Sequence, residues 1–96
     1  MVKIRKRTKT KRFGPLNVSG ICGCPGVYVI LDRNHEPQYV GHSKNLVRRL
    51  EDHLTQEDIP DARYFRTYRT QSTKESEILE RQLIRRLDPR HNVRER

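Results

Sequence analysis

The chain has 96 residues, and its 21 lysines and arginines against 12 aspartates and glutamates give a formal net charge of +9. A chain of this length forms one domain with a small core, which excludes a large internal cavity. It shows neither an apolar run long enough to span a membrane nor a signal-peptide pattern, so we expect no membrane partner. We expect a cytoplasmic protein, with a nucleoid-associated or phage-encoded origin left open. The excess of positive charge favours nucleic acid as the partner.

Residues 1–19 are expected to form a basic, flexible arm that precedes a folded domain over residues 20–96. The first twelve residues carry seven lysines and arginines and no acid, and such a block of like charge repels itself. Two interpretations stay open: the arm lies along a phosphate backbone, or it is a solvated tail with no dedicated partner. On the first interpretation, the arm contacts DNA through Lys6, Arg7, Lys11 and Arg12.

The two cysteines, Cys22 and Cys24, are separated by one residue. They are too few for a zinc site and too close in sequence for an ordinary structural disulfide. We therefore expect reduced thiols, as in a cytosolic protein.

A β-hairpin is predicted over residues 26–41. Residues 26–31 are rich in Val, Ile, Tyr and Leu, a polar turn follows, and a second short strand ends at Gly41. Tyr28 and Tyr39 each lie close to a glycine, which lets backbone or ligand approach closely. The two phenols either serve a shared site or are core tyrosines whose hydroxyls reach the edge.

The segment after Gly41 predicts a helix, with Ser43 as its N-cap and an apolar stripe of Leu46, Val47, Leu50 and Leu54. Arg49 and His53 lie one turn apart along the border of that stripe, whereas Arg48 points away. An arginine at the core edge beside a surface histidine is the alternative to a functional pair. Residues 63–70 predict a third strand, with arginines on its solvent-exposed face.

The last predicted helix starts at Ser72 or Thr73 and places Glu80 among its apolar residues. Leu79, Leu83, Ile84 and Leu87 define the buried face, and Glu80 falls near its centre. An unpaired buried carboxylate costs several kcal/mol at least. Glu80 therefore needs a partner, and the candidates are an arginine, a proton or a metal ion.

Together these residues resemble the GIY-YIG nuclease family, and the similarity runs from Pro25 to about Val93. Gly26-Val27-Tyr28 and Tyr39-Val40-Gly41 match the two motifs that name it. The family's arginine, its glutamate and its closing asparagine correspond to Arg49, Glu80 and Asn92. The resemblance is strongest to the nuclease domain of UvrC-type excision-repair proteins. It implies an α+β fold, in which helices flank a small three-stranded antiparallel sheet, and a GIY-YIG nuclease domain over residues 20–96.

The resemblance further implies a metal-dependent DNA endonuclease with one Mg²⁺ or Mn²⁺ ion on Glu80 and no organic cofactor. Arg49 would hold the scissile phosphate and Tyr28 would orient water or phosphate. Tyr39 is the candidate general base and His53 the alternative, while Asn92 fixes the chain end against the site. A free phenol has a pKa near ~10, so a phenolic base needs positive charge beside it. Further DNA contacts are expected from His42, Lys44 and Arg48.

Two other classes of function stay open. One is a non-catalytic nucleic-acid-binding protein on the same scaffold, and the other is a small basic structural protein of a ribonucleoprotein particle. The preferred DNA structure, the biological role and the oligomeric state cannot be inferred from the residues. Repair, restriction, phage and mobile-element roles are all compatible with them.

Overall fold

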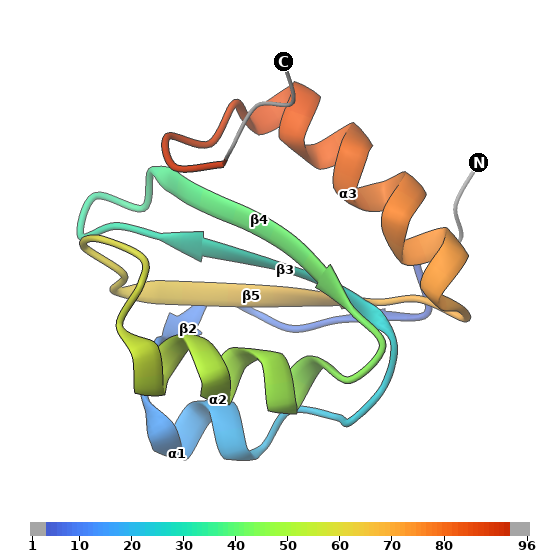
Figure 1. Cartoon of the computed structure of the whole chain (residues 1–96), viewed down its shortest axis with the longest axis horizontal. Helices are drawn as coiled ribbons and strands as arrows, with labels where there is room; N and C mark the ends of the chain where they lie inside the picture. Colours follow the sequence, from blue (N-terminus) through green and yellow to red (C-terminus); the bar gives the residue numbers. More distant parts are fainter. Residues whose placement is uncertain (1–3, 93–96) are drawn as a thin grey trace.

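The computed structural model describes residues 4–92 and arranges them as one sheet between two helical layers. Helix α3 covers one face, and helices α1 and α2 cover the other (Figure 1). None of the helices within residues 4–92 is long and apolar enough to cross a membrane. In chain order the elements are β1 (Lys6–Arg7), β2 (Lys11–Arg12), α1 (Pro15–Ser19), β3 (Gly26–Leu31), β4 (Pro37–Ser43), α2 (Leu46–Gln56), β5 (Tyr64–Arg69) and α3 (Thr73–Leu87).

Strand β3 lies at the centre of the sheet and pairs antiparallel with β4 on one side and β5 on the other. The predicted order of strand, strand, helix, strand, helix is thus confirmed, as is the three-stranded antiparallel core. The two short strands β1 and β2 both add to the outer edge of β5. Strand β4 therefore forms the opposite border of the sheet.

The alternation of side chains along β3 divides the core into two halves. Tyr28 and Ile30 face α1 and α2, whereas Val27 and Val29 face α3. All residues of β3 are buried, because helices cover both faces of the sheet at this strand. Tyr28 thus starts from the centre of the sheet, on the face that α2 covers.

The structure differs from the flexible arm that we expected over residues 1–19. The backbone N–H of Arg5 donates to the carbonyl of Arg69 at the end of β5, and that of Phe13 donates to the carbonyl of Arg63 just before β5, each at 2.8 Å. Helix α1 follows and buries Val18 completely. The outer edge of β5 offers unpaired backbone groups, and pairing with them outweighs the repulsion between the cations. Residues 1–3 lie outside the described part of the chain.

Strand β5 meets the expectation of solvated arginines at Arg69, which is exposed, but not at Arg66. Phe65 and Thr67 point to the α1 and α2 side of the sheet and are buried, whereas the residues that alternate with them are half-buried or exposed. On the α3 side, Arg66 is half-buried and its Nε donates to the hydroxyl of Tyr68 at 2.6 Å. Arg66 thus serves the internal packing of the sheet.

The two long helices begin at polar caps. The side chain of Asn45 accepts from the backbone N–H of Arg48, so Asn45 and not Ser43 is the N-cap of α2. The Ser43 hydroxyl instead accepts from the N–H of Asn45 at 2.9 Å. For α3 the cap is Ser72, one of the two residues predicted, and it accepts from the N–H of Glu75. Each cap satisfies a donor that the first helical turn leaves free.

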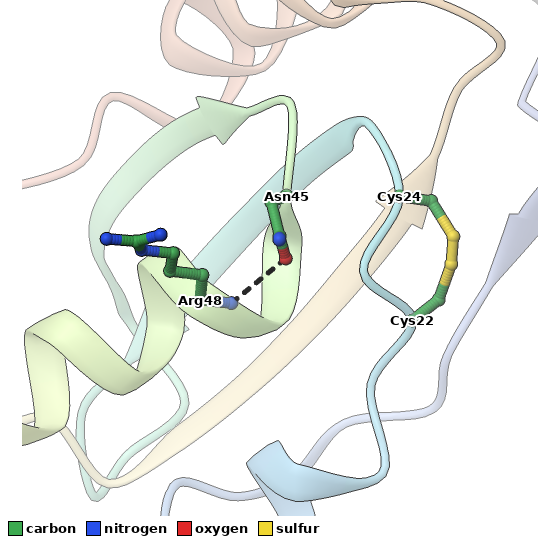
Figure 2. Close-up of a disulfide and its surroundings, with 4 residues drawn as sticks. All are labelled: Cys22, Cys24, Asn45 and Arg48. Carbon is green, nitrogen blue, oxygen red and sulfur yellow. Dashed lines mark hydrogen bonds between the residues drawn. A yellow bond between two sulfur atoms is a disulfide. The ribbon is translucent and has the colours of Figure 1, made fainter.

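The structure places the sulfur atoms of Cys22 and Cys24 together as a disulfide (Figure 2), whereas the sequence predicted two reduced thiols. The chain bends at Gly23, and the Cα atoms of the two cysteines are 5.2 Å apart, within the range that a disulfide spans. The bond lies in the loop that leads into β3, beside the Asn45 cap of α2 (Figure 2). Sequence separation alone was a poor guide to the distance between these side chains.

Candidate active site

Gly41 allows the Tyr28 side chain to reach across strand β4. The two residues are cross-strand partners in the antiparallel pair. A Cβ atom at position 41 would overlap the Tyr28 hydroxyl and would lie 2.9 Å from a ring carbon of Tyr39. Because glycine has no Cβ, the Tyr28 ring can lie over the backbone of the border strand.

Tyr28, Tyr39 and His53 form one aromatic cluster on the α2 side of the sheet. The ring centroid of His53 lies 5.4 Å from that of each tyrosine, and the two phenol rings are 6.1 Å apart. The Tyr28 hydroxyl lies 2.8 Å from Nε2 of His53, and both residues are buried. The two phenols predicted from the sequence therefore do lie close together, and His53 contacts both of them from α2.

Arg49 lies near both phenols, at the mouth of the cluster. Burial raises the pKa of Tyr28, and the neighbouring Tyr39 adds to the rise, while the Arg49 guanidinium opposes it. Burial disfavours the charge on Arg49, but Tyr28, Tyr39 and the Asp52 carboxylate outweigh this and raise its pKa. Tyr28 is thus a protonated phenol that can donate and accept hydrogen bonds, and Arg49 is a fixed cation beside it.

Glu80 lies on the opposite side of β4, on helix α3, and its side chain is 21% exposed. It does not lie at the centre of the buried face, where Ser76 and Leu79 are buried instead. Its partner is none of the three that we expected, because Oε1 of Glu80 lies 2.8 Å from Nδ1 of His42 on β4. An ionised carboxylate can only accept, so the imidazole donates in this pair. His42 was expected to contact DNA.

Charged and polar groups on the two faces of the sheet interact across the border strand β4. The negative charge of Glu80 is among the influences that raise the pKa of Tyr28, although the two side chains belong to different faces. Gly41 and His42 are adjacent on β4, so the aromatic cluster and the carboxylate flank the same short stretch of strand. Arg49 and Glu80 therefore approach the same short stretch of β4 from its two sides.

The residues around Glu80 suit a weakly held divalent cation. Within residues 4–92 no group of three or more His, Cys, Asp and Glu side chains is placed to hold a metal ion. Magnesium often binds one carboxylate, with waters and substrate phosphate completing its shell, so a lone accessible glutamate fits it. Glu77, one turn earlier on α3, lies 3.9 Å from Nε2 of His42. The residues present thus fit Mg²⁺ bound through Glu80.

Asn92 fixes the end of the described chain to the outer edge of β4. Its Oδ1 accepts from the N–H of Val40, and its Nδ2 donates to the carbonyl of Val40, both at 2.7 Å. The backbone N–H of His91 donates to the carbonyl of Gln38 at 2.7 Å. The Asn92 side chain therefore satisfies both backbone groups of Val40, as a residue of a neighbouring strand would. These contacts hold the border strand in place between Tyr39 and Gly41.

The remaining predicted DNA contacts fall into two groups. Lys44 and Arg48 are exposed at the start of α2, close in sequence to Arg49, and Figure 2 shows the Arg48 side chain pointing away from the disulfide. The arm cations are also exposed, but they lie on β1 and β2, at the opposite border of the sheet from β4. A cavity of about 390 Å³ lies at that border, and its basic lining residues are Lys6, Arg7, Lys9, Lys11 and Arg69.

One hydrogen-bonded residue at this site was missed by sequence reasoning. Asp58 follows α2, and its Oδ1 lies 2.8 Å from Nδ1 of His53. Helical periodicity relates residues three or four positions apart, whereas this contact spans five positions and crosses the end of the helix. The only sign of this contact in the sequence was an acidic residue just beyond the end of the predicted helix that carries His53.

The chain is similar to known proteins over most of its length. The family model for the UvrC-like GIY-YIG domain matches residues 24–93. The UvrABC system protein C of Methylococcus capsulatus is 38% identical over an alignment of 81 residues, and the match covers 76% of this chain. The protein of the same name from Neisseria gonorrhoeae is 31% identical and covers 82% of this chain. The chain spans only 13% and 14% of the length of these two relatives.

Solved structures agree with these relatives. The GIY-YIG N-terminal endonuclease domain of UvrC from Thermotoga maritima, bound to its catalytic magnesium, is 26% identical with a TM-score of 0.67. The match covers 81% of this chain and 93% of that chain. A point mutant of the same domain, also bound to its catalytic divalent cation, gives a TM-score of 0.68. The resemblance inferred from the motifs is confirmed, and the chain belongs to the UvrC-like GIY-YIG family of endonuclease domains.

Proposed function

We propose that this chain is a divalent-metal-dependent DNA endonuclease domain with an excision-repair role. The observation that carries the proposal is the meeting of a phenol, an arginine and a carboxylate on the two sides of β4. Tyr28 and Arg49 reach this strand from one face, and Glu80 reaches it from the other. Family membership and the UvrABC name of its relatives support the repair role. A cytoplasmic location stays a prediction.

In the proposed reaction, water adds to the phosphorus atom and the bond from phosphorus to the 3′ oxygen breaks. The products are a 3′-hydroxyl and a 5′-phosphate. Arg49 holds a non-bridging oxygen of the phosphate as negative charge accumulates on it. Glu80 would hold the cation, and binding through Oε1 would replace its contact with His42. A divalent cation at this position supplies Lewis-acid stabilisation of the phosphoryl and departing oxygens.

Tyr39 is the stronger candidate for the general base that activates the water. Both ring nitrogens of His53 are already engaged, one by Tyr28 and one by Asp58, and the side chain is 3% exposed. Tyr39 is half-buried, so its hydroxyl has better access to solvent. In this arrangement Tyr28 orients the water, and Asn92 holds the border strand through Val40.

Cleavage of supercoiled DNA in Mg²⁺ or Mn²⁺ tests the proposal. We expect nicking by the wild-type chain, and loss of it in Glu80→Ala with little change in DNA affinity. Glu51→Ala is the control, since it removes an exposed carboxylate from α2. Equal cleavage by wild type and Glu80→Ala would reject the metal role. A wild-type chain that binds DNA and never cuts it would favour the non-catalytic alternative. A panel of flaps, forks, nicks and duplexes would then identify the preferred substrate.

A further inference from the structure

A continuous chain of hydrogen bonds links Asp58, His53 and Tyr28. Oδ1 of Asp58 lies 2.8 Å from Nδ1 of His53, and Nε2 of His53 lies 2.8 Å from the Tyr28 hydroxyl. The carboxylate is 40% exposed, whereas the imidazole is buried. These two hydrogen bonds therefore connect the solvent-exposed carboxylate of Asp58 to the buried phenol that reaches across β4.

The backbone after α2 brings Asp58 back onto the helix. Glu57 adopts a left-handed conformation with φ of 50° and ψ of 42°, and its N–H donates to the carbonyl of His53 at 2.8 Å. A residue other than glycine in this region costs about 1 kcal/mol. Ile59 is buried in the core immediately beyond Asp58. The turn at Glu57 and the anchor at Ile59 together place the Asp58 carboxylate beside Nδ1.

The chemistry of the three groups fixes the direction of both hydrogen bonds as long as the imidazole of His53 is neutral. An ionised carboxylate accepts and cannot donate, so Nδ1 of His53 must carry a proton. A neutral imidazole then has its lone pair on Nε2, and the Tyr28 hydroxyl donates to it. Burial raises the pKa of Tyr28, so the phenol keeps this proton. The lone pairs of the phenol oxygen are left to accept a hydrogen bond.

We propose that Asp58 is a positioning residue for DNA cleavage, because it holds His53 in the tautomer that makes Tyr28 an acceptor toward the substrate. The proposal rests on the endonuclease function proposed above. Without the carboxylate, the imidazole is free to carry its proton on Nε2. It would then donate to the Tyr28 oxygen and occupy a lone pair that the attacking water or Arg49 needs.

The tautomer of His53 is measured by ¹⁵N NMR of the ring nitrogens in the full chain. We expect a proton on Nδ1 in the wild type and a shift toward the Nε2-protonated form in Asp58→Ala. Asp58→Glu keeps a carboxylate at this exposed position and should restore the wild-type tautomer. Glu51→Ala, which removes an exposed carboxylate from α2, is the control. An unchanged ring spectrum in Asp58→Ala, or a doubly protonated ring in the wild type, would overturn the proposal.

Cleavage kinetics provide the second readout. We expect kcat to fall about tenfold to 100-fold in Asp58→Ala, with KM for DNA nearly unchanged, and to recover in Asp58→Glu. This loss is smaller than the ~10⁴-fold effect of a reversed tautomer in a buried catalytic triad, since Asp58 is exposed. A kcat in Asp58→Ala equal to that of Glu51→Ala would refute the proposal. Absence of cleavage by the wild type would instead refute the endonuclease function, while the NMR result would still test the tautomer.

Discussion

Nδ1 of His42 lies 2.8 Å from Oε1 of Glu80, so the glutamate that the family motif assigns to metal binding is held by a histidine of the border strand. His42 directly follows Gly41, and its side chain points to the opposite face from the Tyr28 ring. Oε1 of Glu80 therefore has a hydrogen-bond donor within the protein. A cation that binds this oxygen has to replace that hydrogen bond.

Replacing His42 by alanine should tighten metal binding. A hydrogen bond to a charged group contributes roughly 1.5–3 kcal/mol, and the partial exposure of this pair reduces that value. We expect Mn²⁺ affinity in the absence of DNA to rise about threefold to tenfold in His42→Ala, measured by titration calorimetry. His35→Ala, at the exposed turn between β3 and β4, is the control. Weaker Mn²⁺ binding by His42→Ala would show that the imidazole is itself a ligand.

Neighbouring arginines on α2 provide a matched pair. Arg49 lies beside the phenols, whereas Arg48 is exposed at the start of α2. Removing one donor that stabilises transition-state charge typically lowers kcat ~10²–10³-fold. We expect a loss of this size in Arg49→Ala and less than about a threefold change in Arg48→Ala, which only weakens a phosphate contact. Similar kcat values for the two variants would make Arg49 an ordinary DNA contact.

Gly41→Ala should damage both the fold and the site. The added Cβ would overlap the Tyr28 hydroxyl, and the Tyr28 ring is itself fully buried. Overpacking of this kind costs about 1–3 kcal/mol. We expect a lower melting temperature and a loss of kcat of at least about 100-fold in the fraction that stays folded. Gly14→Ala is the control, because a Cβ there meets no atom within 4 Å. Wild-type melting and cleavage in Gly41→Ala would contradict this packing.

Asp32 should make the fold sensitive to acid. The backbone N–H of Glu36 contributes most to lowering the pKa of this carboxylate below 3.8, with help from Asn34 and Gln38. Because the folded state favours the charged form, the stabilisation is complete above the ordinary value and is lost as the pH falls through the lowered one. We expect the free energy of unfolding to fall less steeply below pH 3.8 in Asp32→Asn than in the wild type.

Urea unfolding measured at several pH values between 2 and 7 checks this expectation. Glu51→Gln, which removes an exposed carboxylate, is the control. Identical slopes for Asp32→Asn and the wild type below pH 3.8 would show that the turn does not depend on the charge of Asp32.

The sequence predicted the main elements well because hydrophobic periodicity and β-branched runs are local signals. The strands around Tyr28 and Tyr39 and the helix that carries Arg49 followed from them. Contacts between residues on different elements of the sheet could not be predicted from these local signals. His42 meets Glu80 because register places it opposite α3, and no local pattern encodes that contact. The pairing of the N-terminal arm with β5 was missed for the same reason, since charge repulsion is visible in the sequence and an open strand edge is not.

The two ends of the described chain lie along opposite borders of the same sheet. The N-terminal strands cover β5, and residues 90–92 pair with part of β4. Uncovered strand borders invite other chains to add to them and start aggregation. Segments from the two ends of the described chain cover both borders of the sheet, so a truncation that removes either segment would produce a protein more prone to self-association. Size-exclusion profiles of such truncations would record that change as self-association.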